Sequence, residues 1–279
     1  MKPLDATHTI EALVRFLRTS LGTAGFSRAV IALSGGVDSS VSAALAVRAL
    51  GHENVYPLLL PYGNLDGQSA RDARVVITSL GIPENNITQR DIQPLVDLII
   101  PLERELKFAT TIDNIRRGNV MARVRMILLY DYAKKRNALV VGTENKTEHL
   151  LGYFTRFGDE ASDIEPLRNL YKTQVQDLAR QLQLPEQIIT KTPTAGLWEG
   201  QTDEEELGFS YAQADKILSM IVDKKSRLIE IVHQREVNFA TTKRARSKLR
   251  YYWDVVEKVV KRMKDNEYKH HLPMIPSAK

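Results

Sequence analysis

Blocks of apolar and polar residues alternate along the chain and predict strands and helices in turn. Residues 28–33 and 55–60 are short apolar runs bounded by turn residues, and we expect both to form buried strands. Apolar residues at helical spacing predict helices over 8–23, 37–50 and 66–80. This order of strand, helix, strand and helix is typical of a parallel sheet with right-handed crossovers.

The second half of the chain continues the pattern with fewer strands. No linker rich in Pro, Gly or Ser divides the sequence, so we expect one domain over residues 1–279. Glycine, threonine and acidic residues are frequent in 192–208, which we expect to be a mobile loop. The other expected elements are helices over 114–134, 173–182, 210–238 and 250–264, a strand over 138–142, and a polar stretch over about 143–172.

Composition narrows the function classes. The chain has 279 residues, of which 43% are hydrophobic and 26% charged, as in ordinary globular proteins. No apolar run is long enough to span a membrane and the N-terminus has no signal-like segment, so we expect a cytoplasmic protein. There is no cysteine, which excludes disulfides, thiolate–zinc sites and a thiol nucleophile. The net charge of +5 suits phosphate-rich ligands or nucleic acid, and equally a solvated basic surface.

A phosphate-binding turn is the strongest local signal. The sequence SGGVDSS, residues 34–40, lies where a buried strand ends and a helix begins. Two glycines let backbone N–H groups approach an anion, and the helix N-terminus adds donors and a positive dipole end. Asp38 is suited to hold Mg²⁺ that bridges phosphate oxygens. The turn lacks the GK[ST] ending of a Walker A loop and resembles the pyrophosphate loop of the ATP pyrophosphatases.

A second polar segment follows the strand expected over 138–142. Parallel strands share one carboxyl edge, so Thr143 and Glu148 should lie near the SGGVDSS turn. Glu148 is suited to supply a second carboxylate to the same metal ion. Taken alone, Glu148 is better interpreted as a solvated helix residue, and only its context favours the metal site.

Four further blocks are similar to the NAD synthetase family and occur in its order across nearly the whole chain. They are LLLPYG, NVMARVRMILLY, GTENKTEHLLGYFTRFGDEASDIEPLRNLYKTQV and KTPTAGLWEGQTDEEELG. The resemblance implies a doubly wound parallel α/β sheet with flanking helices, of the adenine nucleotide alpha-hydrolase type, and a homodimer. It implies a carbon–nitrogen ligase that converts deamido-NAD to NAD with ATP and ammonia and releases AMP and pyrophosphate. Glutamine-dependent members carry a further domain with a cysteine nucleophile. Because this chain has no cysteine, it resembles the ammonia-dependent form.

The resemblance also assigns roles to matched positions. Asp159 matches a catalytic-loop aspartate, and we expect it to bind ammonium and help remove its proton. Arg156 stands where a lysine is common, and Thr242 stands where many relatives have a histidine. The implied ATP contacts are Ser34, Gly35, Gly36, Asp38, Ser39, Ser40, Thr143, Lys172 and Thr194; the metal ligands are Asp38 and Glu148; the catalytic residues are Asp38, Asp159 and Lys172; and the deamido-NAD contacts are Arg123, Arg156, Asp163, Thr242 and Lys243.

Three alternatives stay open at this point. Residues 243–264 are basic with aromatic residues nearby, which would also suit an ATP pyrophosphatase that modifies tRNA. The blocks over 142–208 argue against this, and we expect no nucleic-acid or membrane partner. A nucleotide sensor with an inactive site is a third class. The presence of Asp38, Glu148 and Lys172 argues against it.

Tyr153 and Phe154 are equally suited to stack on a pyridine ring or to pack in the core.

Overall fold

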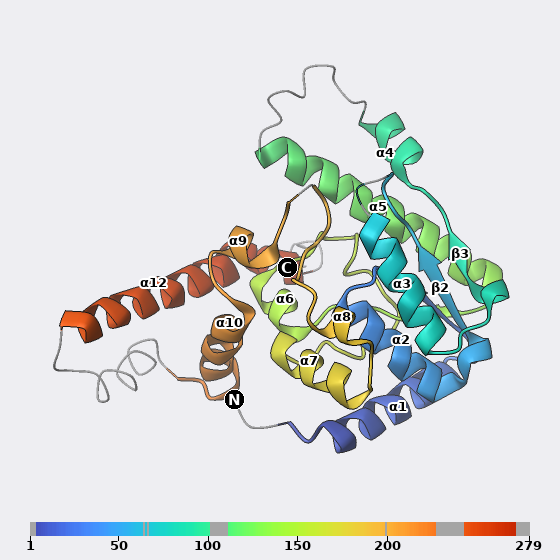
Figure 1. The fold of residues 1–279 in the computed structure, drawn as a ribbon, viewed down its shortest axis with the longest axis horizontal. Coiled ribbons are helices and arrows are strands. Elements are labelled where there is room, and N and C mark those ends of the chain that lie inside the picture. The colour runs from blue at the N-terminus through green and yellow to red at the C-terminus, as the bar shows by residue number, and fades with distance from the viewer. Residues whose placement is uncertain are drawn as a thin grey trace, which may run out of the picture.

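Four parallel strands form the sheet at the centre of the fold (Figure 1). Their order is β3-β2-β1-β4. The strands are β1 (Ala29–Ala32), β2 (Val55–Leu59), β3 (Thr88–Gln89) and β4 (Leu139–Val140). Residue Ala29 of β1 pairs with Val55 on one side and Leu139 on the other. The computed structural model describes residues 4–63, 65, 67–100, 111–198, 200–226 and 243–271, without the side chains of 111 and 243–251.

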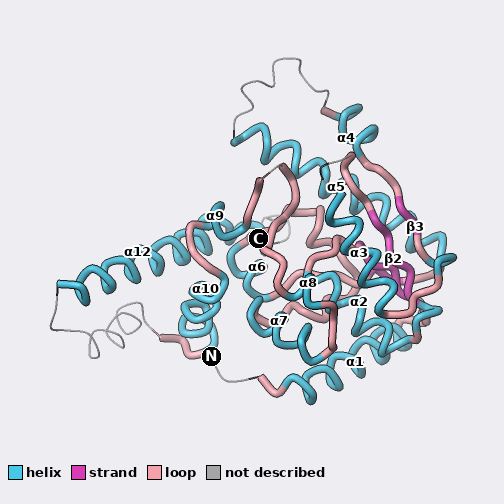
Figure 2. Tube along the Cα trace, in the orientation of Figure 1, coloured by secondary structure: helices cyan, strands magenta, loops and turns pink. Residues whose placement is uncertain are grey.

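Helices account for most of the other described residues (Figure 2). They are α1 (Ala6–Thr23), α2 (Val37–Leu50), α3 (Gly67–Ser79), α4 (Gln93–Ile99), α5 (Thr111–Arg136), α6 (Lys146–Leu151), α7 (Lys172–Gln181), α8 (Glu186–Ile189), α9 (Asp203–Leu207), α10 (Tyr211–Leu218) and α12 (Lys243–Asn266). Short 3₁₀ turns lie at His52–Asn54, Glu84–Asn86 and Glu267–His270. No helix in these described ranges is long and apolar enough to cross a membrane.

Helices cover both faces of the sheet because its strands are apolar on both sides. In β1, Ile31 packs in a core with α1, α2 and α7, while Val30 packs in a second core with α4 and α5. In β2, Leu59 belongs to the first core and Leu58 to the second. Strands buried on both faces are characteristic of parallel sheets covered by crossover helices. The expected doubly wound α/β fold is confirmed.

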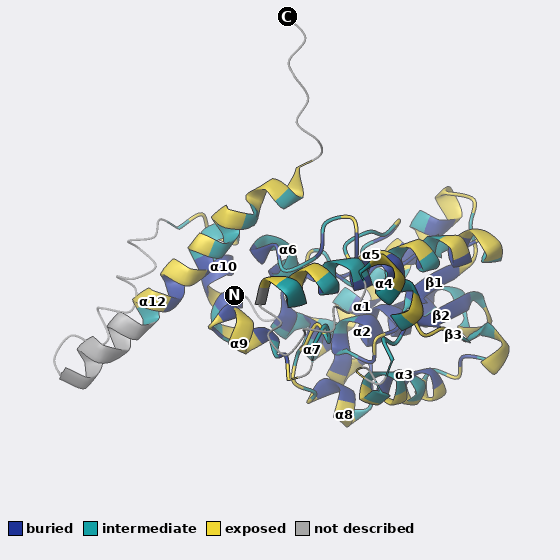
Figure 3. Ribbon diagram, turned by 90° about the horizontal axis from the view of Figure 1, so that it is seen from above, coloured by how far each residue is buried: buried dark blue, intermediate teal, exposed yellow. Residues whose placement is uncertain are grey.

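A third apolar cluster joins α6, α10 and α12. Of these helices, α10 and α12 lie away from the strands, toward one end of the molecule (Figure 3). The centre of this cluster contains Leu151, Ile217 and Val259, all fully buried. The prediction of one continuous helix over 210–238 was wrong, because the observed helix is shorter. Helix α10 ends at Leu218 and is followed by a single π-helical turn, Ser219–Asp223, while residues 227–242 lie outside the described residues.

Candidate active site

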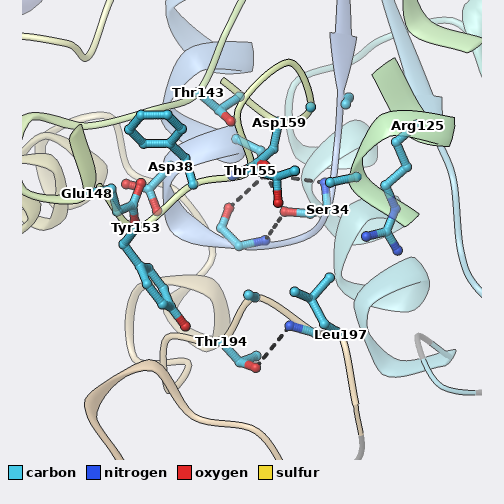
Figure 4. Close-up of a pocket in the computed structure, with 18 of the residues that line it drawn as sticks. Ser34, Asp38, Arg125, Thr143, Glu148, Tyr153, Thr155, Asp159, Thr194 and Leu197 are labelled. Carbon is cyan, nitrogen blue, oxygen red and sulfur yellow. Dashed lines mark hydrogen bonds between the residues drawn. The ribbon is translucent and has the colours of Figure 1, made fainter. Parts of the chain in front are cut away.

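A cavity of about 550 Å³ opens beyond the carboxyl ends of β1 and β2 (Figure 4). Ser34 follows β1, Leu60 follows β2, and Thr143 follows β4, and all three line this cavity. Open parallel sheets bind their ligands at this edge. The carboxyl edge of the sheet, where the sequence predicts the active site, therefore borders a cavity. One wall of this cavity is polar, and another includes apolar residues of α5 such as Met126.

The SGGVDSS turn forms the floor of the cavity. Gly35 has a φ of +73°, and Gly36 is the N-cap of α2 with no side-chain cap of its own. The Ser34 and Ser39 hydroxyl oxygens are 3.1 Å apart and both line the cavity, whereas Ser40 is fully buried and donates to the Gly36 carbonyl at 2.7 Å. Because α2 begins here, its first N–H groups are available to an anion.

One ammonium and two carboxylates meet beside this floor. Lys172 Nζ lies 2.5 Å from Asp38 Oδ2 and 2.9 Å from Glu148 Oε1. Burial alone would lower the pKa of Lys172, but these two carboxylates raise it above its usual value, so the ammonium stays charged. Burial and the nearby Asp38 raise the pKa of Glu148, an effect that Lys172 opposes. Three residues far apart in sequence thus form one charged centre.

Local helix-capping chemistry positions these groups. Asn145 caps α6: its side chain accepts from the Glu148 N–H at 3.0 Å and donates to Asp38 Oδ1 at 2.9 Å. The pattern Asn-Lys-Thr-Glu is a capping box, in which the fourth residue returns to the cap. Thr147 Oγ1 accepts from the Lys172 N–H at 2.9 Å and so fixes the start of α7. Sequence reasoning missed Asn145, although the capping-box spacing is a usable signal.

A third carboxylate, also missed from the sequence, lies in the same wall. Asp203 is buried and accepts hydrogen bonds from Tyr211 Oη at 2.8 Å and Tyr153 Oη at 3.0 Å. Burial raises its pKa, which the positive charge of Lys172 opposes. The Lys172 ammonium also lies 4.9 Å from the centre of the Tyr211 ring. No local pattern distinguishes Asp203 from Glu204, Glu205 and Glu206, because its contacts come from α10 and from the turn after α6.

Asp159 lies in the loop that follows α6. Its carboxylate accepts from the Thr155 N–H at 2.8 Å, and both residues line the cavity (Figure 4). The surrounding protein raises the pKa of Asp159, but the residue is exposed to the solvent of the cavity, which weakens that effect. Asp159 therefore presents a carboxylate to the cavity without a cation bonded to it in the described part of the chain.

The C-terminal end of the described chain holds this loop in place. Lys269 Nζ donates to the Gly152 carbonyl at 2.7 Å and to the Phe154 carbonyl at 2.9 Å. Arg262 lies 5.1 Å from the centre of the Tyr153 ring. Tyr153 and Phe154 both line the cavity, which keeps stacking on a flat ligand open to either ring. No local sequence pattern predicts that the end of α12 lies against this loop.

The segment over 192–208 has two unlike halves. Thr194 lines the cavity, and Leu197 packs on Gly118 of α5, where an added Cβ would lie 2.7 Å from Leu197 Cδ1. The second half is not a loop: α9 spans Asp203–Leu207, and Leu207 is buried. The segment expected to be a loop thus includes a short helix. Thr202 stabilises the start of this helix by accepting from the Glu205 N–H.

Nine of the residues expected at the site from sequence line the cavity. They are Ser34, Gly36, Asp38, Ser39, Thr143, Glu148, Asp159, Lys172 and Thr194. Gly35 and Ser40 support the turn from behind.

The expected deamido-NAD contacts are placed differently. Arg123 donates to the Arg156 carbonyl at 3.1 Å, and Asp163 accepts from the Val140 N–H at 2.8 Å. Arg123, Arg156 and Asp163 all lie outside the cavity wall. Thr242 lies outside the described residues, and Lys243 opens α12 with its side chain undescribed.

The fold and this site define a nucleotide-binding α/β protein of the adenine nucleotide alpha-hydrolase type. A sequence model of the NAD synthase family matches residues 9–273, and the chain belongs to this family. An NH(3)-dependent NAD(+) synthetase of Thermococcus kodakarensis is 43% identical, over 99% of this chain and 99% of its own. One of Fusobacterium nucleatum is 41% identical, over 96% of this chain and 94% of its own.

Solved structures agree with the sequence comparison. NMN synthetase from Francisella tularensis has a TM-score of 0.78 and 33% identity, covering 99% of this chain and 100% of that one. An NH3-dependent NAD synthetase from Campylobacter jejuni, in complex with the nitrate ion, has a TM-score of 0.74 and 29% identity, with coverage of 99% and 100%.

Proposed function

We propose that this chain amidates deamido-NAD to NAD, using ATP and ammonia and releasing AMP and pyrophosphate. The single observation that carries the proposal is the meeting of Asp38, Glu148 and Lys172 beside the SGGVDSS turn. In a member of the NAD synthase family, two carboxylates and an ammonium beside such a turn suit the splitting of ATP between its α and β phosphates.

The turn and the start of α2 bind the phosphates. Backbone N–H groups near Gly36 and the Ser34 and Ser39 hydroxyls face the cavity and stabilise a phosphate oxygen by hydrogen bonding. Thr194, from the other side, supplies a further hydroxyl to the nucleotide. The apolar wall on α5, which includes Met126 and Leu129, suits a flat base or ring.

Activation of the carboxylate is the first chemical step. An oxygen of the nicotinate carboxylate attacks the α-phosphorus of ATP, and the bond from that phosphorus to the bridging oxygen breaks, so that pyrophosphate leaves. The step brings anions together and needs positive charge at the phosphates. Lys172 provides it, since its ammonium stays protonated and lies beside the turn.

The Asp38 and Glu148 carboxylates fit Mg²⁺. No three His, Cys, Asp or Glu side chains within the described ranges form a complete metal cage. Mg²⁺ does not need one, because it binds through one or two protein carboxylates together with phosphates and water. When bound here it neutralises phosphate charge. Asp38 Oδ2 and Glu148 Oε1 already converge on a cation, the Lys172 ammonium.

Ammonia completes the reaction. It attacks the acyl carbon of the adenylated carboxylate, the bond from that carbon to the AMP oxygen breaks, and the nitrogen loses one proton to solvent to give the amide. Near neutral pH the donor is mainly ammonium, which has no lone pair for the attack. Asp159 faces the cavity and is suited to bind ammonium and accept its proton. The assembly proposed for the cell is a cytoplasmic homodimer.

Purified protein with ATP, Mg²⁺ and deamido-NAD is expected to form NAD with ammonium and not with glutamine. The chain has no cysteine and so lacks the thiol with which glutaminases release ammonia. Chromatography should show NAD, AMP and pyrophosphate in equal amounts. Nicotinic acid mononucleotide serves as a competing acceptor, because one structural neighbour is an NMN synthetase. Equal turnover with ammonia-free glutamine, or a preference for the mononucleotide, would refute this assignment.

We also propose that the first half of the 192–208 segment moves over bound substrates and excludes water from the adenylate. Residues 192–198 should become protected from hydrogen exchange when ATP and deamido-NAD bind together. Residues 203–207 should be protected already, because Asp203 and Leu207 are buried. In a Trp253→Phe background, Trp198 fluorescence should change with both ligands. Slow exchange over 192–198 in the free protein, unaltered by ligands, would show a fixed surface loop.

A further inference from the structure

Besides Lys172 and Lys269, a further lysine borders the cavity, and the sequence analysis assigned it no role. Lys191 directly precedes the 192–208 segment and lines the cavity with its side chain 22% exposed. Its ammonium lies 2.7 Å from Asp72 Oδ2 in α3. The Asp72 side chain is only 5% exposed and does not line the cavity. A nearly enclosed carboxylate therefore holds a cation at the cavity wall.

Donors from three segments fix the Asp72 carboxylate. Gln68 of α3 donates to its Oδ1 at 2.8 Å, Gln187 of α8 donates to the same oxygen at 3.2 Å, and Lys191 donates to Oδ2. Burial alone would raise the pKa of Asp72, but the bonds from Lys191 and Gln68 hold it below its usual value. The carboxylate stays charged and its position is fixed.

This ion pair lies directly against the phosphate-binding turn. A Cβ on Gly35 would come within 2.5 Å of the Ser69 carbonyl oxygen and 2.8 Å of Asp72 Cβ. The turn therefore rests on the part of α3 that carries Ser69 and Asp72. Ser69 also lines the cavity, and its hydroxyl lies 3.5 Å from Lys191 Nζ. Lys191 is thus linked to the turn through two residues that touch both.

Lys172 and Lys191 differ in how far nearby carboxylates neutralise their positive charge. Lys172 has two carboxylates within hydrogen-bond distance, both suited to hold a metal ion. Lys191 has one. An ammonium has three N–H donors. Among the described residues, Asp72 and Ser69 accept two from Lys191, which leaves one for a ligand in the cavity. A polyphosphate on the adjacent turn is the anion that this donor would meet.

We infer that Lys191 is a second phosphate-binding cation that contacts the pyrophosphate portion of ATP and the released pyrophosphate, and that Asp72 is its positioning residue. The inference rests on the proposed function, since it places the ATP phosphates on the SGGVDSS turn. It adds a residue to that site and explains why a buried ion pair is held behind the turn.

Calorimetric titration with ATP, inorganic pyrophosphate and AMP, each with Mg²⁺, tests the inference. Lys191→Met keeps the apolar stem and removes the charge. It should weaken ATP and pyrophosphate binding at least about tenfold, because a charge-assisted hydrogen bond is lost. AMP, which lacks the pyrophosphate portion, should bind within about twofold of its original affinity. Lys191→Arg should recover part of the loss, and Lys135→Met, on the exposed end of α5, should change nothing.

Asp72→Asn tests the positioning role. Alone it should weaken pyrophosphate binding several-fold and spare AMP. In the Lys191→Met background it should have no further effect, because it acts through Lys191.

The outcomes separate this inference from the function. Unchanged pyrophosphate binding by Lys191→Met, or an equal loss for AMP, overturns the inference while NAD formation by the unaltered chain upholds the function. If the unaltered protein binds neither ATP nor pyrophosphate, both are wrong.

Discussion

Asp38→Ala is expected to slow pyrophosphate release about a hundredfold, since loss of one charge-stabilising group at a transition state commonly has an effect of that size. Asp38 lies in the first turn of α2 and reaches Lys172 from the SGGVDSS turn, where we propose that the phosphates bind. Its loss removes a proposed metal ligand and also an acceptor for the Asn145 side chain. Higher Mg²⁺ concentrations should recover part of the rate.

Glu148→Ala should behave in the same way, because Glu148 approaches the same ammonium from α6. Pyrophosphate release in a single turnover, measured with ATP and deamido-NAD but no ammonium, isolates the adenylation step. Asp177→Ala, which removes an exposed carboxylate of α7, is the matched control. Circular dichroism should show an intact fold in every variant. A variant with a nearly normal rate of release removes that residue from the metal site.

Lys172→Met is expected to slow adenylation between about a hundredfold and a thousandfold, as loss of a preorganised donor does in other enzymes. The Mg²⁺ concentration that this variant requires should not rise, in contrast to Asp38→Ala. Without the ammonium, Mg²⁺ no longer competes with Lys172 for the Asp38 and Glu148 carboxylates, so Mg²⁺ should bind at least as tightly as before. This separates a cation that acts on phosphate from a residue that only holds the metal ligands together.

Lys172→Arg is the conservative partner of that variant. Its planar, longer side chain does not fit the compact space between two carboxylates, so only part of the activity should return. Because Lys172 is buried, thermal unfolding of each variant checks the fold. Adenylation by a folded Lys172→Met at the original rate would mean that another group supplies the positive charge.

The sequence predicted those parts of the site that depend on local patterns and on one rule of sheet geometry. The SGGVDSS turn joins β1 to α2 as expected, because an apolar run, two glycines and a helical period are all local features. Glu148 lies beside Asp38 because parallel strands share a carboxyl edge. The expected strand over 138–142 is shorter, with Val141 forming an isolated bridge to Ile164.

The parts that sequence reasoning missed depend on packing between distant segments. Strand β3 has two residues and carries no readable alternation. Asp203 becomes part of the site only because Tyr211 and Tyr153 bond to it, and Lys191 only because Asp72 holds it. The role of Arg123 in binding deamido-NAD stays a prediction, since its side chain lies outside the cavity wall.

Transfer of oxygen from substrate to AMP tests the central claim most directly. Deamido-NAD is labelled with ¹⁸O in both oxygens of its nicotinate carboxylate and converted with ATP and ammonium. If the carboxylate is adenylated and ammonia then displaces AMP, mass spectrometry will find one ¹⁸O in each AMP and one in the amide of each NAD. Unlabelled AMP, or ADP with labelled phosphate in its place, would show that the carboxylate never bonds to the α-phosphorus and would contradict the account.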